Sequence, residues 1–161
     1  MGTSEISIRT EIQPGDIERI IEQHRILYEE EFGFNSDFSD YVATTLAGNI
    51  ERIWIAEQNG EFAGCIGIVE VEKKNVQLRW LLVEPSARGN GLGQKLMYEL
   101  LEYCNNKSYD LIFLWTVNKL PAARKLYELF AFQLVEENPE SILWGQLLKE
   151  QRWDLSLNAN R

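Results

Sequence analysis

The segment between residues 81 and 93 has the residue types and the spacing most suited to chemistry. Its sequence is Leu81-Leu82-Val83-Glu84-Pro85-Ser86-Ala87-Arg88-Gly89-Asn90-Gly91-Leu92-Gly93. An apolar strand leads into a turn with three alternate glycines, where a helix is expected to begin. Glycines let successive N–H groups point into one concavity, and a helix N-terminus adds unpaired donors and the positive end of its dipole. The turn from Arg88 to Gly93 therefore predicts an anion site suited to a pyrophosphate.

Other interpretations of this turn fit the sequence less well. A dinucleotide-binding fingerprint needs G-x-G-x-x-G near the start of a chain, whereas these glycines are spaced G-x-G-x-G behind an arginine and late in the chain. A Walker A loop needs Lys and then Ser or Thr after its glycines, and Gln94 follows Gly93. A plain turn without a ligand rarely needs three glycines.

The elements that must position this turn follow one another without a linker or an internal repeat. Hydrophobic periodicity predicts a mixed α+β chain. We expect strands over Ser4–Ile12, Arg52–Glu57, Phe62–Val71, Val76–Val83, Leu111–Trp115, Phe132–Glu136 and Gln151–Leu157. We expect helices from Asp16 to about Gly33 and over Ser36–Leu46, Gly91–Cys104 and Pro121–Phe130. In the strand before the turn, alternation places Val76, Leu78, Trp80 and Leu82 on one face.

Length and composition predict a single globular domain. The chain has 161 residues, of which 45% are hydrophobic and 11% aromatic, enough for one core but not for two. Residues 1–10 lack a basic segment followed by an apolar run, and no stretch reaches the roughly 20 apolar residues of a membrane span. We therefore expect a soluble, cytoplasmic protein that does not bind a membrane.

Charge and metal-ligating residues exclude two classes of partner. The formal net charge of -9 disfavours nucleic acid, which is held by clustered Lys and Arg, and favours a cationic partner. Cys65 and Cys104 lie far apart among apolar neighbours, and the chain has one histidine. Because no pair of Cys or His residues has the spacing of metal ligands, we expect no metal site.

Around the glycine turn, the sequence resembles the GNAT family of N-acetyltransferases. The family motif is a strand, then R/Q-x-x-G-x-G/A, then a helix, and Arg88, Gly91 and Gly93 match it. The resemblance extends from about Ile6 to Leu157 and implies one domain over residues 6–157. Further stretches resemble the acetyltransferase half of MarR–GNAT fusion proteins: His24–Phe34, Trp54–Glu57 and Ala122–Tyr127. One departure is Leu120, where many members have Asn.

This resemblance implies a fold and a substrate. The fold would be α+β, with a mostly antiparallel twisted sheet of about seven strands, about four helices, and fourth and fifth strands that splay apart around acyl-CoA. The pantetheine arm would bond to the backbone near Leu81 and Val83, and the pyrophosphate to the amides of residues 88–93. The implied binding residues for acetyl-CoA are Leu81, Leu82, Val83, Arg88, Gly89, Asn90, Gly91, Leu92 and Gly93.

Few side chains are strictly required for acyl transfer from a thioester to an amine. Tyr127 matches the family tyrosine that protonates the CoA thiolate. The general base stays open between Glu31, Glu70, Glu72 and ordered water. His24 lies on an apolar helix face and is expected to be structural. An acceptor pocket could be shaped by Tyr28, Arg79, Trp115 and Trp144.

The leading hypothesis is an acetyl-CoA-dependent N-acetyltransferase. Its acceptor would be the primary amine of a small molecule, a peptide or a protein, and would be cationic in solution. The alternative is a non-catalytic sensor or regulatory module that binds acyl-CoA, suggested by Leu120 and by a fourth strand without a carboxylate. The sequence leaves the oligomeric state open, including a homodimer through the C-terminal strands.

Overall fold

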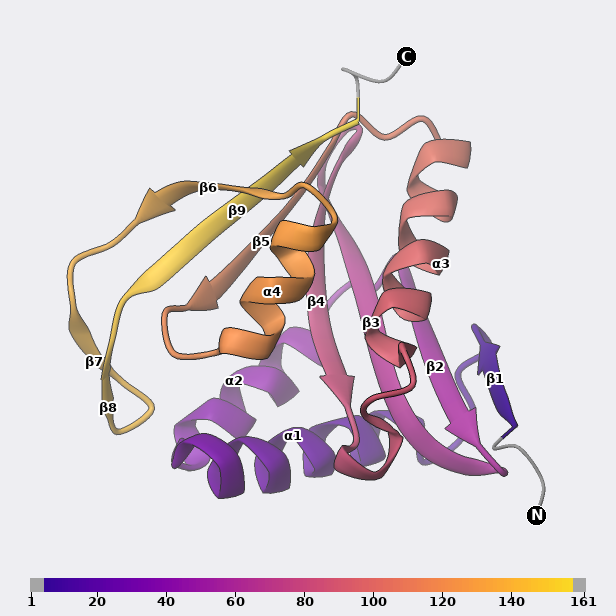
Figure 1. Cartoon of the computed structure of the whole chain (residues 1–161), viewed down its shortest axis with the longest axis horizontal. Coiled ribbons are helices and arrows are strands. Elements are labelled where there is room, and N and C mark those ends of the chain that lie inside the picture. Colours follow the sequence, from indigo (N-terminus) through magenta and orange to yellow (C-terminus); the bar gives the residue numbers. More distant parts are fainter. Residues whose placement is uncertain (1–4, 158–161) are drawn as a thin grey trace.

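The computed structural model describes residues 5–157 and contains, within them, a seven-stranded sheet, a two-stranded hairpin and four α-helices (Figure 1). The strands are β1 (Ile6–Arg9), β2 (Arg52–Gln58), β3 (Glu61–Glu72), β4 (Asn75–Val83), β5 (Leu111–Val117), β6 (Gln133–Glu137), β7 (Ser141–Leu143), β8 (Gln146–Leu148) and β9 (Glu150–Ser156). The helices are α1 (Asp16–Phe32), α2 (Ser36–Leu46), α3 (Leu92–Asn106) and α4 (Pro121–Leu129).

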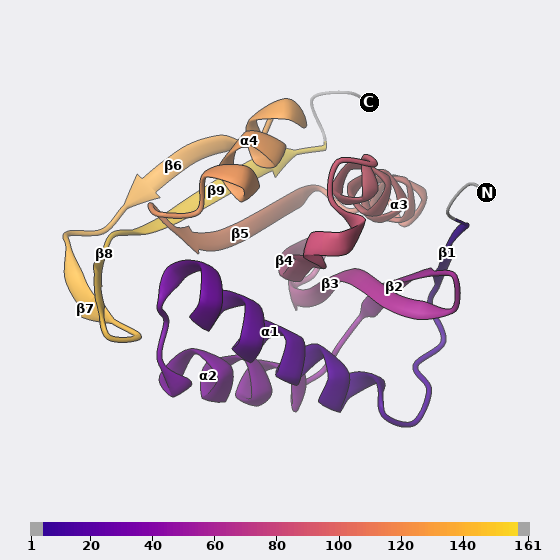
Figure 2. The same ribbon diagram turned by 60° about the horizontal axis from the view of Figure 1, so that its bottom comes forward.

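The large sheet has the strand order β1-β2-β3-β4-β5-β9-β6. All neighbouring strands are antiparallel except β4 and β5, which are parallel. Helices α1 and α2 cover one face, and α3 and α4 cover the other (Figure 2). The α+β class, the mostly antiparallel sheet and the four helices predicted from the sequence are therefore confirmed.

Strands β4 and β5 separate soon after they begin. Their ladder joins Asn75–Gln77 to Leu111–Phe113 and extends no further within the described chain. Beyond Gln77, the edge of β4 that faces β5 has no strand partner among residues 5–157. The predicted splay is confirmed, and it leaves backbone donors and acceptors of β4 available to a ligand between the strands.

One prediction about β4 is wrong, because a β-bulge interrupts its alternation. Leu82 pairs with Cys65 and Arg79 with Gly67, so β4 contains one residue more than β3 over this interval. Trp80 adopts a φ of 56°, within the left-handed region. A bulge reverses the faces of the residues that follow it. Val76 and Leu78 consequently pack against α3 and α4, whereas Trp80 and Leu82 pack against α1 and α2.

The bulge is held by contacts on both sides of Trp80. The indole Nε1 donates to Thr45 Oγ1 at 2.9 Å, and the Trp80 carbonyl accepts from the Cys65 thiol at 3.0 Å. The ring lies over Gly67, where an added Cβ would come within 2.5 Å of the indole. The conformation of Trp80 is thus fixed by packing rather than by the local sequence.

The corner between α1 and α2 brings aromatic side chains beside β4. Gly33 ends α1 in the left-handed region at a φ of 72°, and the Asn35 side chain caps α2 by accepting from the Asp37 amide at 3.0 Å. Tyr28 on α1 and Phe38 on α2 then pack with ring centroids 4.6 Å apart. These two rings form one side of the smaller of the two cavities described below.

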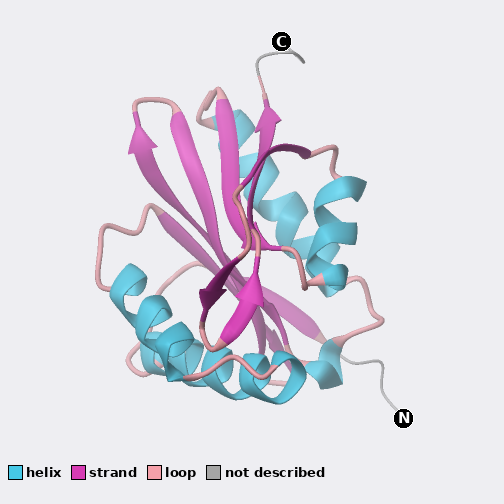
Figure 3. Cartoon of the chain, turned by 90° about the vertical axis from the view of Figure 1, so that its left-hand side faces the viewer, coloured by secondary structure: helices cyan, strands magenta, loops and turns pink. Residues whose placement is uncertain are grey.

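Two details differ from the expected element boundaries. The first strand covers only Ile6–Arg9, while Ser4, where it was expected to begin, lies outside the described residues. The hairpin of β7 and β8 was not expected; it lies at the side of the molecule that faces the viewer in Figure 3. Among the described helices, none combines the length and apolarity that crossing a bilayer requires.

Candidate functional site

The glycine turn forms a concave set of unpaired amides. Gly89 and Gly91 have φ values of +85° and +74°, which L side chains rarely adopt. The first helical hydrogen bond runs from the Lys95 amide to the Gly91 carbonyl at 3.0 Å. Within residues 5–157, the N–H groups of residues 89–94 meet no protein acceptor. Six donors at the positive end of α3 are therefore available to an anion.

The side chain of Arg88 is already engaged by protein groups. Its Nη1 lies 3.0 Å from Glu31 Oε2, and its Nε donates to the Val83 carbonyl at 3.1 Å. Hydrogen bonding to Glu31 raises the pKa of the Arg88 guanidinium further above its ordinary value. Arg88 thus ties the turn to α1 and β4, and the backbone amides supply most of the free donors.

A cleft of about 490 Å³ lies beside these amides. Its lining includes nearly all the residues expected to bind acetyl-CoA: Leu81, Leu82, Val83, Arg88, Gly89, Gly91, Leu92 and Gly93. Asn90 is exposed and does not line it. The opposite wall comes from α1 and α4, so the cleft crosses the splayed side of β4.

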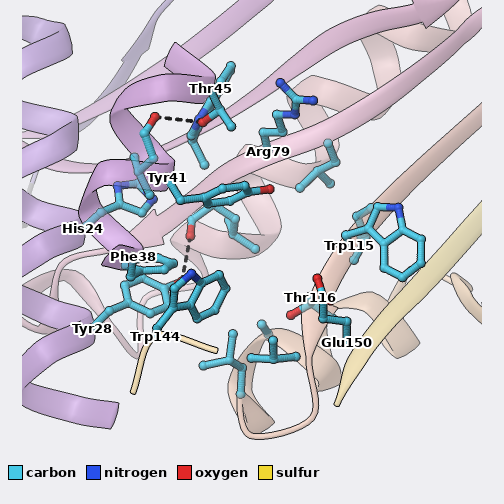
Figure 4. Close-up of a pocket in the computed structure, with 18 of the residues that line it drawn as sticks. His24, Tyr28, Phe38, Tyr41, Thr45, Arg79, Trp115, Thr116, Trp144 and Glu150 are labelled. Carbon is cyan, nitrogen blue, oxygen red and sulfur yellow. Dashed lines mark hydrogen bonds between the residues drawn. The ribbon is translucent and has the colours of Figure 1, made fainter. Parts of the chain in front are cut away.

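A second cavity, of about 190 Å³, opens between the splayed strands and is shown in Figure 4. We call its flat side chains the aromatic wall: Tyr28, Phe38, Tyr41, Trp115 and Trp144. Phe38 and Trp144 meet edge to face with centroids 4.8 Å apart. The cavity also contains two charged side chains, Arg79 and Glu150, which lie at different sides of it (Figure 4).

The two cavities share four lining residues, Tyr28, Leu81, Leu120 and Ala123. The Tyr28 hydroxyl donates to the Leu81 carbonyl at 3.4 Å, immediately after the bulge. Burial raises the pKa of Tyr28 to about 12. Leu120, which replaces the asparagine of the family pattern, therefore forms part of an apolar passage between the cleft and the cavity.

Tyr127, the expected catalytic residue, lines the smaller cavity and is 5% exposed. Burial raises the pKa of its phenol above the ordinary value of about 10. The phenol therefore keeps its proton at neutral pH and can donate a hydrogen bond, whereas complete transfer to a thiolate of pKa near 8.5 is uphill. Its ring also packs against Phe132 and Trp153, with centroids 5.9 and 6.3 Å away.

None of the carboxylates considered as a base from the sequence lines the cavity with Tyr127. Glu31 is paired with Arg88 in the larger cleft, and Glu70 and Glu72 line a separate hollow at the far end of β3. Glu150 is the carboxylate that lines the smaller cavity. No local signal in the sequence identified it, because it reaches the cavity through the pairing of β9 with β5.

His24 has the structural character expected of it. It is 3% exposed and stacks on Tyr28 with ring planes 4° apart. Its Nδ1 lies 2.7 Å from the Ile20 carbonyl, which can only accept, so Nδ1 carries the proton. Burial lowers the pKa of His24 to about 4, which keeps the ring neutral at neutral pH. Within residues 5–157, no group of three or more His, Cys, Asp or Glu side chains is arranged to hold a metal.

Comparison with known proteins identifies sequence relatives among acetyltransferases. The chain is 29% identical to N-acetyltransferase family 8 member 3 of Rattus norvegicus over 108 residues, which cover 64% of this chain and 47% of that protein. It is 29% identical to N-acetylaspartate synthetase of Danio rerio over 112 residues, covering 69% and 40%. The chain thus spans less than half the length of these two curated relatives.

Solved structures share the fold at low sequence identity. A putative acetyltransferase, yncA, from Salmonella typhimurium, determined with its cofactor acetyl-CoA, has a TM-score of 0.72 at 16% identity and covers 94% of both chains. A GNAT-family acetyltransferase from Staphylococcus aureus Mu50 has a TM-score of 0.77 at 20% identity and covers 95% of this chain and 99% of the other.

The sequence profile of the acetyltransferase (GNAT) family matches residues 18–132, which include most of α1 and all of the splayed strands, the glycine turn and α4. That match covers more than half of the chain, and the fold carries the splay and the amide turn described above. The chain therefore belongs to the GNAT family of acetyltransferases.

Proposed function

We propose that residues 6–157 act as one N-acetyltransferase domain that transfers the acetyl group of acetyl-CoA to a primary amine. The observation that carries this proposal is the meeting of two cavities at Tyr28, Leu81, Leu120 and Ala123. One cavity has the free amides that suit a pyrophosphate, and the other has the volume for a small acceptor. A module that only senses acyl-CoA has no need of the second cavity.

The residues expected to bind acetyl-CoA fit that substrate. Six unpaired amides at residues 89–94 suit the pyrophosphate, and the open edge of β4 suits the amide groups of the pantetheine arm. The Leu81, Leu82 and Val83 backbone lies on that edge beside the cleft. Asn90 would contribute through its backbone alone, because its side chain is exposed.

The ammonium nitrogen of the acceptor must lose two protons, one before it attacks and one as the amide forms, and the sulfur of CoA must gain one. The amine nitrogen attacks the thioester carbonyl, a C–N bond forms, the C–S bond breaks and the thiolate leaves. We assign Glu150 as the group that takes the proton of the ammonium, directly or through water, because it is the carboxylate in the acceptor cavity. Tyr127 donates a hydrogen bond to the departing sulfur, and the second proton of the acceptor nitrogen passes to the thiolate directly or through water.

Release of the CoA thiol from acetyl-CoA, measured with a panel of primary amines, tests the function. Turnover with at least one small amine or peptide is expected. Tight binding of acetyl-CoA without thiol release for any amine would instead favour the sensor. The net charge of -9 predicts that the ammonium form of the acceptor is drawn to the protein, so capture should weaken as salt rises.

The oligomeric state stays a prediction. Strand β6 lies at the edge of the sheet, and Leu134 and Val135 on it are 39% and 54% exposed. An edge strand with exposed apolar side chains is suited to pairing with a second copy. Sedimentation equilibrium of the wild type and of Val135→Lys would test a homodimer through this strand.

A further inference from the structure

Arg79 carries a positive charge that no carboxylate of the described chain neutralises. Its Nε and Nη2 both donate to Gln77 Oε1, at 3.1 and 2.7 Å, and no Asp or Glu oxygen of residues 5–157 lies within 4.0 Å of its guanidinium. Arginine cannot lose its proton at physiological pH. The Nη1 donors have no hydrogen-bond partner among the described residues, and the Arg79 side chain that carries them is half-buried and lines the cavity.

This arrangement differs from that of most arginines in the part of the chain that the structure describes. Five of them have a carboxylate partner within 4.0 Å: Arg9, Arg25, Arg88, Arg124 and Arg152. Arg19 and Arg52 lie over aromatic rings instead, and neither lines the smaller cavity. The chain has 25 acidic residues and 16 Lys and Arg, so carboxylates are abundant. A half-buried arginine without a carboxylate partner is therefore suited to bind the carboxylate of a ligand, because a guanidinium and a carboxylate can form two parallel hydrogen bonds.

Gln77 holds Arg79 in position for such a ligand. Gln77 is 8% exposed, and its single amide oxygen accepts from two guanidinium nitrogens. Both residues precede the bulge on β4 and line the smaller cavity. Because Nε and Nη2 both donate to Gln77, Nη1 is the nitrogen left for a ligand, together with the second N–H of Nη2.

The position of Arg79 limits the distance between the carboxylate and the reacting amine. Arg79 is two residues before Leu81, which lines the passage where the amine must meet the thioester. The bulge at Trp80 lies between them, so regular strand spacing does not apply there. Because Arg79 and Leu81 line one cavity of about 190 Å³, a ligand that reaches both is small, and an amino acid with its amine and carboxylate on one carbon is the most compact such ligand.

Aromatic and aliphatic side chains make up most of the rest of the lining, together with a few polar groups such as Thr116 and Glu150. Of the aromatic wall, Tyr28, Phe38 and Trp144 lie together away from Arg79, and Tyr41 and Trp115 lie nearer to it (Figure 4). The volume of about 190 Å³ is below the roughly 300–1,000 Å³ typical of sites for drug-sized ligands. The third substituent of the acceptor carbon should therefore be one aromatic or large apolar group.

We propose that the acceptor is a free α-amino acid with an aromatic or large apolar side chain, whose carboxylate binds Arg79 and whose side chain packs on the aromatic wall. This proposal rests on the N-acetyltransferase function stated above and names its substrate class. The net charge of the protein attracts the ammonium group of this acceptor, while Arg79 supplies the local positive charge that its carboxylate needs.

The test uses pairs of amines that differ only by the α-carboxylate: tryptophan with tryptamine, phenylalanine with phenethylamine, and tyrosine with tyramine. For the wild type we expect kcat/KM to be higher for the amino acid of each pair. Arg79→Gln should lower kcat/KM for the amino acids by about 10- to 100-fold, as expected for loss of hydrogen bonds to a charged group. It should change kcat/KM for the decarboxylated amines by less than about threefold, which corresponds to well under 1 kcal/mol.

Two further variants separate local recognition from charge and folding. Arg25→Gln removes the same charge from the exposed surface of α1, where Arg25 forms an ion pair with Glu22. It should leave kcat/KM unchanged for both amines of each tested pair. Arg79→Lys keeps the charge without the planar fork and should recover part of the preference for amino acids. Circular dichroism and acetyl-CoA affinity verify that each variant is folded with an intact cleft.

A second readout keeps the substrate class distinct from the catalytic function. Binding of phenylalanine and phenethylamine, which do not mask tryptophan emission, is expected to change the fluorescence of Trp115 and Trp144 in the cavity, and this signal does not require turnover. Tighter binding of the amino acids that is lost in Arg79→Gln supports the proposal even if no thiol is released, an outcome that removes only the catalytic function. Equal or better use of the decarboxylated amines by the wild type, or an equal loss for both members in Arg79→Gln, overturns the proposal and leaves acetyl transfer standing.

Discussion

Replacing Gly91 by aspartate tests the anion site most directly. An added Cβ at Gly91 meets no atom within 4 Å, so the substitution creates no clash in the folded protein. The φ of +74° makes any side chain there strained, by about 1 kcal/mol. For a chain of this length, such a loss lowers the melting temperature by about 2–4 °C. The variant should therefore fold.

The effect on acetyl-CoA should be much larger than the effect on folding. Two unit charges 4 Å apart repel by about 4 kcal/mol at an effective dielectric constant of about 20. Water at this exposed turn removes part of that repulsion, and we expect the affinity for CoA to fall by about 100-fold, or about 2.7 kcal/mol. Titration calorimetry with CoA measures it.

Gly60 provides a matched control for this experiment. It has a φ of +84°, and an added Cβ there also meets no atom within 4 Å, but it lies in the turn between β2 and β3, away from the cleft. Gly60→Asp should reproduce the change in melting temperature and the added charge while CoA affinity stays as in the wild type. Unchanged CoA affinity in a folded Gly91→Asp variant would show that the pyrophosphate does not bind at this turn.

Three further predictions concern the interior of the molecule. Tyr127→Phe keeps the packing of the ring but removes its donor, so kcat should fall by about 100-fold with little change in the KM for acetyl-CoA; a loss below about threefold, with chemistry rate-limiting, would mean that the ring only packs. Gly67→Ala places a Cβ 2.5 Å from the Trp80 ring and should lower the free energy of unfolding by about 1–3 kcal/mol in urea titrations, and an unchanged midpoint would contradict the packing described for the bulge. His24 has a folded-state pKa of about 4, below its unfolded value of about 6.5, so the stability it contributes is complete above pH 6.5 and is lost as pH falls toward 4, with a maximum slope of about 1.4 kcal/mol per pH unit. Urea titrations from pH 7 to 5 on the wild type and on His24→Gln measure that slope, and an equal slope in both would exclude His24 as its source.

Features that depend on neighbouring residues were predictable from the sequence. The glycine turn was recognised because glycine at positive φ and a following helix are both local properties. The range Ser36–Leu46 of α2 was predicted at both ends, since Asn35 caps it locally. The splay of β4 and β5 came from family resemblance instead, because no local pattern states where two strands separate.

Features set by distant contacts were not predictable in this way. Val76, Leu78, Trp80 and Leu82 alternate perfectly, and only the packing of Trp80 against Gly67 and Thr45 reveals the extra residue. The β7–β8 hairpin was missed because its turn places Trp144 and Gly145 at positive φ, and tryptophan is not a residue that signals such a turn.

The acceptor cavity was only partly visible in the sequence for the same reason. Tyr28, Arg79, Trp115 and Trp144 were named as residues that could shape it, and all four line it. Glu150 was missed because its place depends on the pairing of Glu150 with Val117 across β9 and β5. The role of Arg79 depends on which carboxylates surround it, and that is a property of the folded chain.

The extra residue at Trp80 determines which face of the sheet each following residue of β4 occupies. Deleting one residue there would return the strand to simple alternation and exchange the inward and outward faces of the residues that follow, including Leu82 and Val83. Loops tolerate such length changes easily, but residues of β4 pack into two separate hydrophobic cores, one on each face of the sheet. We therefore expect related sequences to contain far fewer insertions and deletions between β3 and the glycine turn than in the turns at either end of β2.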